Sequence, residues 1–168
     1  MLATLTAACA THATLRVATP QPFPLVPSPA SLRPAPAPLP AHPVSRVDVM
    51  TTALTFQGVP YQYGGTTPAT GFDCSGFVQY VLGRHEIALP RTAAEQFRIG
   101  QRIGERDLQA GDLVFFSTIA PGASHVGLAL SADEFVHAPA TAGVVRVERL
   151  RSSYWKQRFV GARRLFSE

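Results

Sequence analysis

A cysteine and two histidines, Cys74, His125 and His137, are the residues of this chain best suited to nucleophilic chemistry. Cys74 follows a turn at residues 71–73 and opens an apolar segment with helical spacing, which predicts that it lies in the first turn of a helix. Unpaired backbone N–H groups and the positive end of the helix dipole favour a thiolate there, so we expect a lowered thiol pKa. A thiolate with an imidazole nearby can attack an amide carbonyl.

The two histidines are expected on neighbouring antiparallel strands. Residues 125–130 and 134–137 are strand-like and are separated by a short turn, which indicates a hairpin. A hairpin centred on Ser131 places His125 directly opposite His137, and the Cβ atoms of such a pair lie about 4.5–5.5 Å apart. The spacing therefore predicts that the imidazoles touch, so that His137 fixes the ring of His125.

Each of these residues also has an ordinary structural explanation. A buried cysteine is usually inert packing, and a single histidine is usually satisfied in a core or exposed. One cysteine and two histidines could instead bind a metal ion, but the sequence has no CxxC, HExxH or HxxxH spacing. The combination favours catalysis by cysteine and histidine, without a metal or a cofactor.

The surrounding pattern is typical of an α+β domain. Helices are expected over residues 45–56, 74–84 and 92–98; the first has a Ser45 N-cap and Val47, Met50 and Leu54 near helical spacing. Short strands separated by turns then favour an antiparallel sheet, and they cover residues 113–116, 125–130, 134–137, 144–147 and 160–165.

Composition separates the chain into three parts. Ten of its fifteen prolines fall in residues 20–43, which predicts a disordered Pro-rich linker before a folded domain at residues 44–168. In residues 1–19, small residues precede Cys9 as in a truncated lipoprotein signal. Four alternatives stay open for this segment: lipidation of Cys9, another export signal, a start inside a longer signal, or no targeting role. The sequence contains no run of 18 apolar residues, so no membrane-spanning helix is predicted.

The net charge of +4 comes from fourteen arginines and one lysine against eleven acidic residues. The arginines are scattered, and the sequence contains no basic helix or nucleic-acid motif. We therefore expect a solvated basic surface and no nucleic-acid partner, with weak attraction to an anionic cell envelope as the alternative. A monomer is the default expectation.

The candidate residues lie in seven short segments that share the pattern of a known family. The segments are YQYGG from Tyr61, GFDCSGFVQ from Gly71, LPRT from Leu89, GDLVFF from Gly111, HVG from His125, FVHA from Phe135 and GARR from Gly161. In this order they resemble the NlpC-type family of bacterial cell-wall cysteine peptidases, and the similarity extends over about residues 45–166. The resemblance implies a circularly permuted papain-like fold, with N-terminal helices packed on a five- to six-stranded antiparallel sheet.

The same resemblance implies a function and a site. Cys74 would be the nucleophile, His125 the base and His137 the residue that orients it. The substrate would be peptidoglycan stem peptides, cut between γ-D-glutamate and meso-diaminopimelate. The enzyme would be exported, either to the cell envelope (the periplasm, or the outer membrane as a lipoprotein) or as a secreted protein. Alternatives are an amidase or acyltransferase on the same scaffold, a non-catalytic wall-binding module, and a secreted toxin.

Three further residues match functional positions of the family. Tyr61 would help to form the oxyanion site or position substrate, and Asp73 and Ser75 match positions that bind the free amine of the stem's L-alanine in some members. Judged from the residues alone, Asp73 is equally a helix cap, Ser75 a polar residue at the helix start and Tyr61 a packing aromatic. Arg91 could reach a substrate carboxylate, although an ion pair within the protein is favoured.

Overall fold

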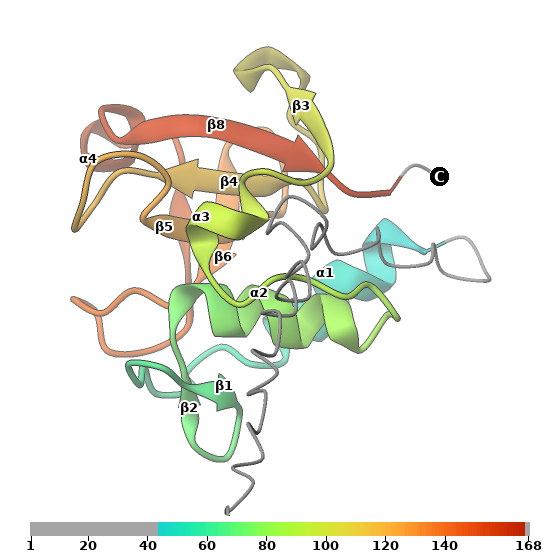
Figure 1. The fold of residues 1–168 in the computed structure, drawn as a ribbon, viewed down its shortest axis with the longest axis vertical. Coiled ribbons are helices and arrows are strands. Elements are labelled where there is room, and N and C mark those ends of the chain that lie inside the picture. Colours follow the sequence, from blue (N-terminus) through green and yellow to red (C-terminus); the bar gives the residue numbers. More distant parts are fainter. Residues whose placement is uncertain (1–43, 167–168) are drawn as a thin grey trace, which may run out of the picture. The chain divides into compact units, whose positions relative to one another are not determined.

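The computed structural model describes residues 44–166, and the predicted signal segment and Pro-rich linker lie outside this range (Figure 1). The elements in chain order are α1 (Arg46–Leu54), β1 (Thr66–Thr67), β2 (Gly71–Phe72), α2 (Cys74–Gly83), α3 (Ala93–Gln96), β3 (Gln101–Ile103), a 3-10 helix (Glu105–Asp107), β4 (Leu113–Phe116), β5 (His125–Ala129), β6 (Glu134–His137), β7 (Arg146–Arg149), α4 (Ser153–Lys156) and β8 (Phe159–Arg164).

Six of these strands form one antiparallel sheet in the order β3-β8-β4-β5-β6-β7, whereas β1 and β2 pair only with each other. Helices α1, α2 and α3 precede this sheet in the chain, so the predicted α+β class is confirmed. The sequence prediction missed β3, whose first two residues are exposed at the sheet edge, and the two-residue strands β1 and β2. Elements this short carry almost no periodic signal.

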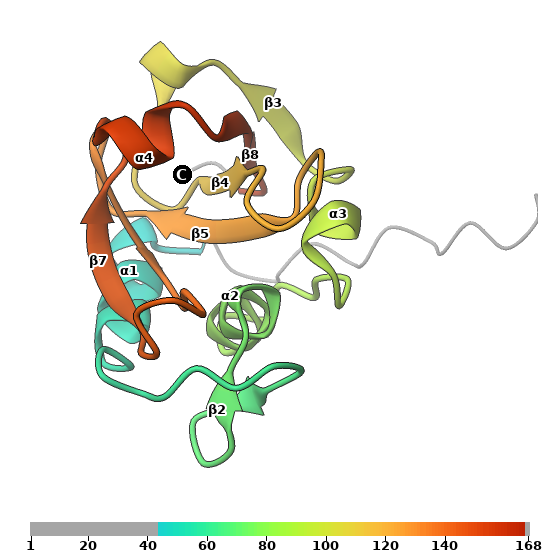
Figure 2. The ribbon, with the colours of Figure 1, turned by 90° about the vertical axis from the view of Figure 1, so that its left-hand side faces the viewer.

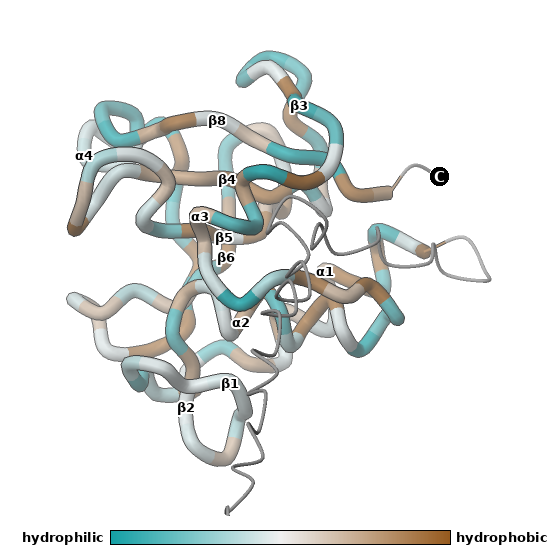
Figure 3. The backbone as a smooth tube through the Cα atoms, viewed as in Figure 1, coloured by the Kyte–Doolittle hydropathy of each residue, from teal (hydrophilic) through white to brown (hydrophobic). Residues whose placement is uncertain are grey.

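Both faces of the sheet are covered by hydrophobic packing. Along β4, Leu113 and Phe115 join the core beneath the helices, and the alternate residues Val114 and Phe116 join a second core that contains Trp155 of α4. Figure 2 shows α1 and α2 on one side of the sheet and α4 on the other. This arrangement explains why β4 is apolar at every position. By contrast, the turn between β3 and β4 is hydrophilic (Figure 3).

Helix α2 has the predicted position, and its apolar residues form its buried face. It is capped by Asp73, and Phe77, Val78, Val81 and Leu82 are fully buried against the sheet. The third helix is also confirmed, and in α3 the Thr92 hydroxyl and the Glu95 carboxylate form a capping box.

Helix α1 begins after Ser45 as predicted, but the apolar residues whose spacing indicated it are not the ones that it buries. Val49 and Ala53 are buried, whereas Val47 is 62% exposed. The apolar residues of this helix surround much of its circumference, so its sequence does not single out one face. Its contact with α2 selects the side that carries Val49 and Ala53.

The fourth predicted strand is displaced by two residues, since β7 runs over Arg146–Arg149 and not over residues 144–147. The backbone of Val145 instead bonds to Gly58 and Val59 in the loop after α1, and Val144 forms a bridge with Pro60. This pairing brings the loop before the nucleophile next to the sheet.

Candidate active site

Cys74 is the first residue of α2, and the residue before it fixes the start of the helix. Asp73 has an extended backbone, and its Oδ1 accepts a hydrogen bond of 2.7 Å from the N–H of Gly76. Cys74 is partly exposed, and the backbone N–H groups of Val126, Ser75 and Cys74 itself point at its sulfur. The predicted position of Cys74 in the first turn of a helix is therefore confirmed.

The loop before α2 lies directly against the start of the helix. Its Gly65 carbonyl accepts a hydrogen bond of 3.1 Å from the N–H of Asp73. The same carbonyl fills the space where a side chain on Gly76 would begin, since a Cβ there would lie 2.1 Å from the oxygen. Tyr61, at the start of the loop, bridges to Phe72 and is thereby held beside the nucleophile.

His125 and His137 touch, although not through the predicted register. Nε2 of His125 lies 2.8 Å from Nδ1 of His137. However, β5 and β6 pair Leu128 with Val136 and Ala129 with Phe135, so the hairpin is shifted by two residues from direct opposition. The histidines are diagonal neighbours, and Gly127 leaves room between them because a Cβ there would lie 3.1 Å from that of His137.

Cys74 and His125 lie on opposite faces of the sheet. Cys74 packs against the core beneath the helices, as do Val126 and Leu128 of β5. His125 lies on the other side of the strand, where its ring stacks on Trp155 at a centroid distance of 5.5 Å and an interplanar angle of 21°. Both side chains border the same space at the start of β5.

A cleft of about 290 Å³ opens at this meeting point, and Tyr61, Cys74 and His125 line it together. Two exposed apolar side chains, Ile119 and Tyr154, stand at its border. His137 does not line the cleft but is fully buried behind His125. The structure therefore brings four predicted residues into one site, with His137 in the place of an orienting group.

The free site holds a neutral thiol and a neutral imidazole, which corrects the expectation of a lowered thiol pKa. Burial raises the pKa of the Cys74 thiol and the charge of Asp73 raises it further, which outweighs the backbone N–H groups that lower it. Burial lowers the pKa of His125 to about 3, and the neighbouring His137 lowers it further. Burial also raises the pKa of Tyr61, so its hydroxyl keeps its proton.

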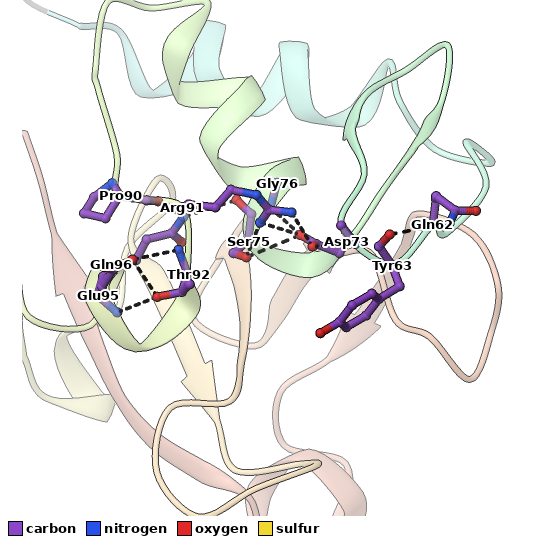
Figure 4. A network of polar contacts seen from close by, with 11 residues as sticks. Gln62, Tyr63, Asp73, Ser75, Gly76, Pro90, Arg91, Thr92, Glu95 and Gln96 are labelled. Carbon is purple, nitrogen blue, oxygen red and sulfur yellow. Dashed lines mark hydrogen bonds and ion pairs between the residues drawn. The ribbon is translucent and has the colours of Figure 1, made fainter.

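Asp73 and Ser75, the two predicted substrate-binding residues, are bonded to each other and to Arg91. Figure 4 shows Arg91 reaching across the start of α2 toward both of them. Its guanidinium lies 2.5 Å from Oδ2 and 3.0 Å from Oδ1 of Asp73, and it donates to the Ser75 hydroxyl at 2.9 Å. The favoured ion pair of Arg91 is thus confirmed. Neither Asp73 nor Ser75 lines the cleft, so their contact with substrate stays a prediction.

Two residues near the site were missed in the sequence, Trp155 and Glu148. Trp155 is the single tryptophan of the chain, but α4 has only four residues and no periodic signal. Glu148 accepts a hydrogen bond from the indole N–H of Trp155 and lies near His137. The available signal was that Arg146 and Glu148 are two residues apart on a strand after His137, so that they share one face of that strand. Cys9 lies outside the described residues.

Within residues 44–166, no helix has both the length and the apolar composition of a membrane span. The same residues include no group of three or more His, Cys, Asp or Glu side chains arranged to hold a metal ion.

Solved structures include close relatives of this fold. A Staphylococcus aureus protein of the NLP/P60 family, described as similar to lipoprotein, is 36% identical with a TM-score of 0.67, over 73% of this chain and 42% of that protein. The NlpC/P60 domain of the peptidoglycan hydrolase SagA is 31% identical with a TM-score of 0.63, and the match covers 73% of this chain and all of that domain.

Sequence comparison gives the same relationship. The gamma-DL-glutamyl hydrolase of Bacillus subtilis is 41% identical over 120 residues, which are 70% of this chain and 29% of that protein. The murein DD-endopeptidase MepH of Escherichia coli is 40% identical over 114 residues, 66% of this chain and 42% of that protein. The chain thus spans less than half the length of these two relatives. The family model described as NlpC/P60 matches residues 58–164, and the chain belongs to the NlpC/P60 family.

Proposed function

We propose that residues 44–168 are a cysteine endopeptidase that hydrolyses the γ-D-glutamyl–meso-diaminopimelate bond of peptidoglycan stem peptides. The observation that carries the proposal is the shared cleft of Cys74 and His125, with His137 bonded to the far nitrogen of the base. The names of the relatives support the choice of substrate, since they include peptidoglycan and murein endopeptidases.

The reaction begins from the neutral pair. Nδ1 of His125, the ring nitrogen not bonded to His137, accepts the thiol proton as the sulfur of Cys74 attacks the amide carbonyl. The imidazolium then gives this proton to the leaving amine as the C–N bond breaks, which leaves a thioester on Cys74. His125 next takes a proton from water, the hydroxide attacks the thioester, and the acid is released as the thiol is restored.

The negative charge that develops on the carbonyl oxygen needs hydrogen-bond donors. The backbone N–H of Cys74 lies at the start of α2, where helical N–H groups have no partner within the helix. Tyr61 lines the same cleft and keeps its phenolic proton because its pKa is raised. These two groups are the proposed oxyanion donors.

A second candidate reaction is cleavage of the D,D cross-link between two stem peptides. The similarity to MepH favours it, because MepH is named a DD-endopeptidase and is 40% identical. The relative of nearly equal identity in Bacillus subtilis is named for a γ-glutamyl bond instead. The two names therefore leave the choice of bond to experiment.

The test uses two defined substrates, the tripeptide L-alanyl-γ-D-glutamyl-meso-diaminopimelate and a D,D-cross-linked muropeptide dimer, with products identified by mass spectrometry. We expect cleavage after γ-D-glutamate by the wild type and none by Cys74→Ala. Cleavage of the dimer alone would establish the second candidate. Other amide products would indicate an amidase or acyltransferase, and equal activity of Cys74→Ala would refute catalysis by this cysteine. Binding of purified sacculi by the wild type without any product would identify a wall-binding module.

A wall substrate also implies a place of action outside the cytoplasm. We propose export to the cell envelope, with attachment to the membrane through a lipid on Cys9 and the domain acting as a monomer. Growth with a radiolabelled fatty acid tests the anchor: label in the wild type and not in Cys9→Ser is expected, and absence of label in both would refute it. Killing of competing bacteria by the purified protein would indicate a secreted toxin.

A further inference from the structure

One ring nitrogen of His137 takes no part in the proposed reaction and has no hydrogen-bond partner among the described residues. His137 is fully buried, and its Nδ1 faces Nε2 of His125. Its own Nε2 has no hydrogen-bond partner among the described residues. Oε1 of Glu148 is an acceptor that lies 3.9 Å from this nitrogen. A movement of about 1 Å by either side chain would bring these atoms within hydrogen-bond distance.

Glu148 is held in this place by two other groups. Its Oε2 accepts the indole N–H of Trp155, and its Oε1 lies 3.2 Å from Nε of Arg146. The strand pairing of β7 with β6 sets His137 opposite Arg146 and Phe135 opposite Glu148, so Glu148 is the diagonal neighbour of His137. Its pKa is lowered to about 2, first by His137 and also by Trp155 and Arg146, so it is ionised at neutral pH.

The proton positions in the histidine pair follow from the reaction. To accept the thiol proton on Nδ1, neutral His125 must carry its own proton on Nε2. That N–H donates to Nδ1 of His137, which must therefore be unprotonated. The proton of neutral His137 is then on Nε2, the nitrogen that faces Glu148. A carboxylate in this position favours this tautomer over the reverse one, in which Nδ1 of His125 is already protonated and cannot act as a base.

Glu148 also contacts the aromatic ring that packs on His125. It binds the indole of Trp155, which stacks on His125 and meets His137 edge-on at a centroid distance of 4.9 Å and 88°. One carboxylate therefore contacts the group that orients the base and the ring that packs on it.

On the basis of the proposed function, we propose that Glu148 is a positioning residue that extends the catalytic chain to four members, by selecting the tautomer of His137 and, through it, that of His125. When His125 accepts the thiol proton, the charge of Glu148 also stabilises the imidazolium through His137. Arg146 faces the same carboxylate and opposes this effect, since its charge lowers the pKa of His137.

The test is Glu148→Gln, which keeps the size of the side chain and removes its charge. We expect kcat to fall about 10- to 100-fold, by analogy with the loss typical when a carboxylate that orients a metal-binding histidine is replaced, with KM nearly unchanged. The apparent pKa of the acidic limb of kcat/KM should fall, because Glu148 raises the pKa of His125. Glu148→Asp keeps the charge and should restore part of kcat and the wild-type profile. Glu134→Gln removes an exposed carboxylate from β6 and is the matched control.

A readout without substrate separates this proposal from the proposed function. Long-range 15N–1H NMR spectra report the tautomer of each imidazole, and we expect Nε2-protonated His125 and His137 in the wild type and a mixture in Glu148→Gln. Wild-type tautomers and an unchanged pH profile in Glu148→Gln would overturn the proposal, even if kcat fell. If no stem peptide is cleaved by the wild type, the proposed function fails, and the NMR result still decides the role of Glu148.

Discussion

Replacing Gly76 by alanine should damage the site through one backbone contact. The new Cβ would lie 2.1 Å from the carbonyl oxygen of Gly65 and 3.0 Å from Oδ1 of Asp73, whereas real Cβ atoms essentially never approach within 3.0 Å. The loop and the helix start must therefore separate by about 1 Å. Overpacking of this kind costs about 1–3 kcal/mol. For a domain of this size that corresponds to a fall in Tm of roughly 4–12 °C. A displacement of about 1 Å beside the nucleophile should lower kcat about 100-fold.

The measurement combines thermal unfolding with release of products from purified sacculi. Gly83→Ala, at the other end of α2, is the matched control because a Cβ there has no atom within 4 Å. Alanine is favoured over glycine in a helix by about 0.5–1 kcal/mol, so this control should keep its activity and unfold at the same or a slightly higher temperature. A Gly76→Ala protein with wild-type Tm and activity would refute the close contact between the loop and the helix.

Two further predictions concern protonation. Alkylation of Cys74 by iodoacetamide, followed on its own tryptic peptide, should reach its midpoint above the ordinary thiol pKa, because burial raises the pKa of this thiol; a midpoint below pH 7 would contradict the neutral pair. Stability should fall as the pH falls from 6.5 toward 3, because the pKa of His125 is lowered to about 3 in the folded state and the unfolded chain binds the proton first. At pH 4.5 this amounts to about 3 kcal/mol relative to neutral pH, measurable by urea unfolding, and His125→Phe should lose much of the dependence. An equal dependence in both proteins would exclude His125 as its source.

Local signals in the sequence were enough to place Cys74 but not to describe its surroundings. Asp73 as a cap and the apolar spacing after Cys74 determine where α2 begins, and both are local. The hairpin was recognised from its strands, but its register depends on the hydrogen bonds between Leu130 and Glu134, which sequence spacing does not reveal. The histidines meet nevertheless, because diagonal neighbours also lie within reach of ring-sized side chains.

The two residues near the site that the sequence analysis missed, Glu148 and Trp155, reach it through contacts between segments that are distant in the chain. Glu148 approaches His137 only because β7 pairs with β6 in one particular register. Trp155 reaches His125 only because α4 covers the face of the sheet opposite α2. Neither relation has a periodic pattern or a fixed spacing from Cys74. The family resemblance could not provide them either, since none of the seven segments that carry it contains Glu148 or Trp155.

The thiol pKa shows why the location of a residue and its reactivity need separate arguments. The start of a helix does supply N–H groups to the sulfur of Cys74, as its sequence position predicts. The same packing that brings His125 to the sulfur buries both groups, and burial disfavours a charge on either of them. A neutral pair needs no counterion and resists alkylation while the cleft is empty. In the proposed reaction, proton transfer accompanies the attack of the sulfur on the carbonyl carbon. The donors beside the site then stabilise the negative charge that develops on the carbonyl oxygen. The buried histidine pair and the carboxylate behind it serve this step, because they determine which nitrogen of His125 is free to accept the proton.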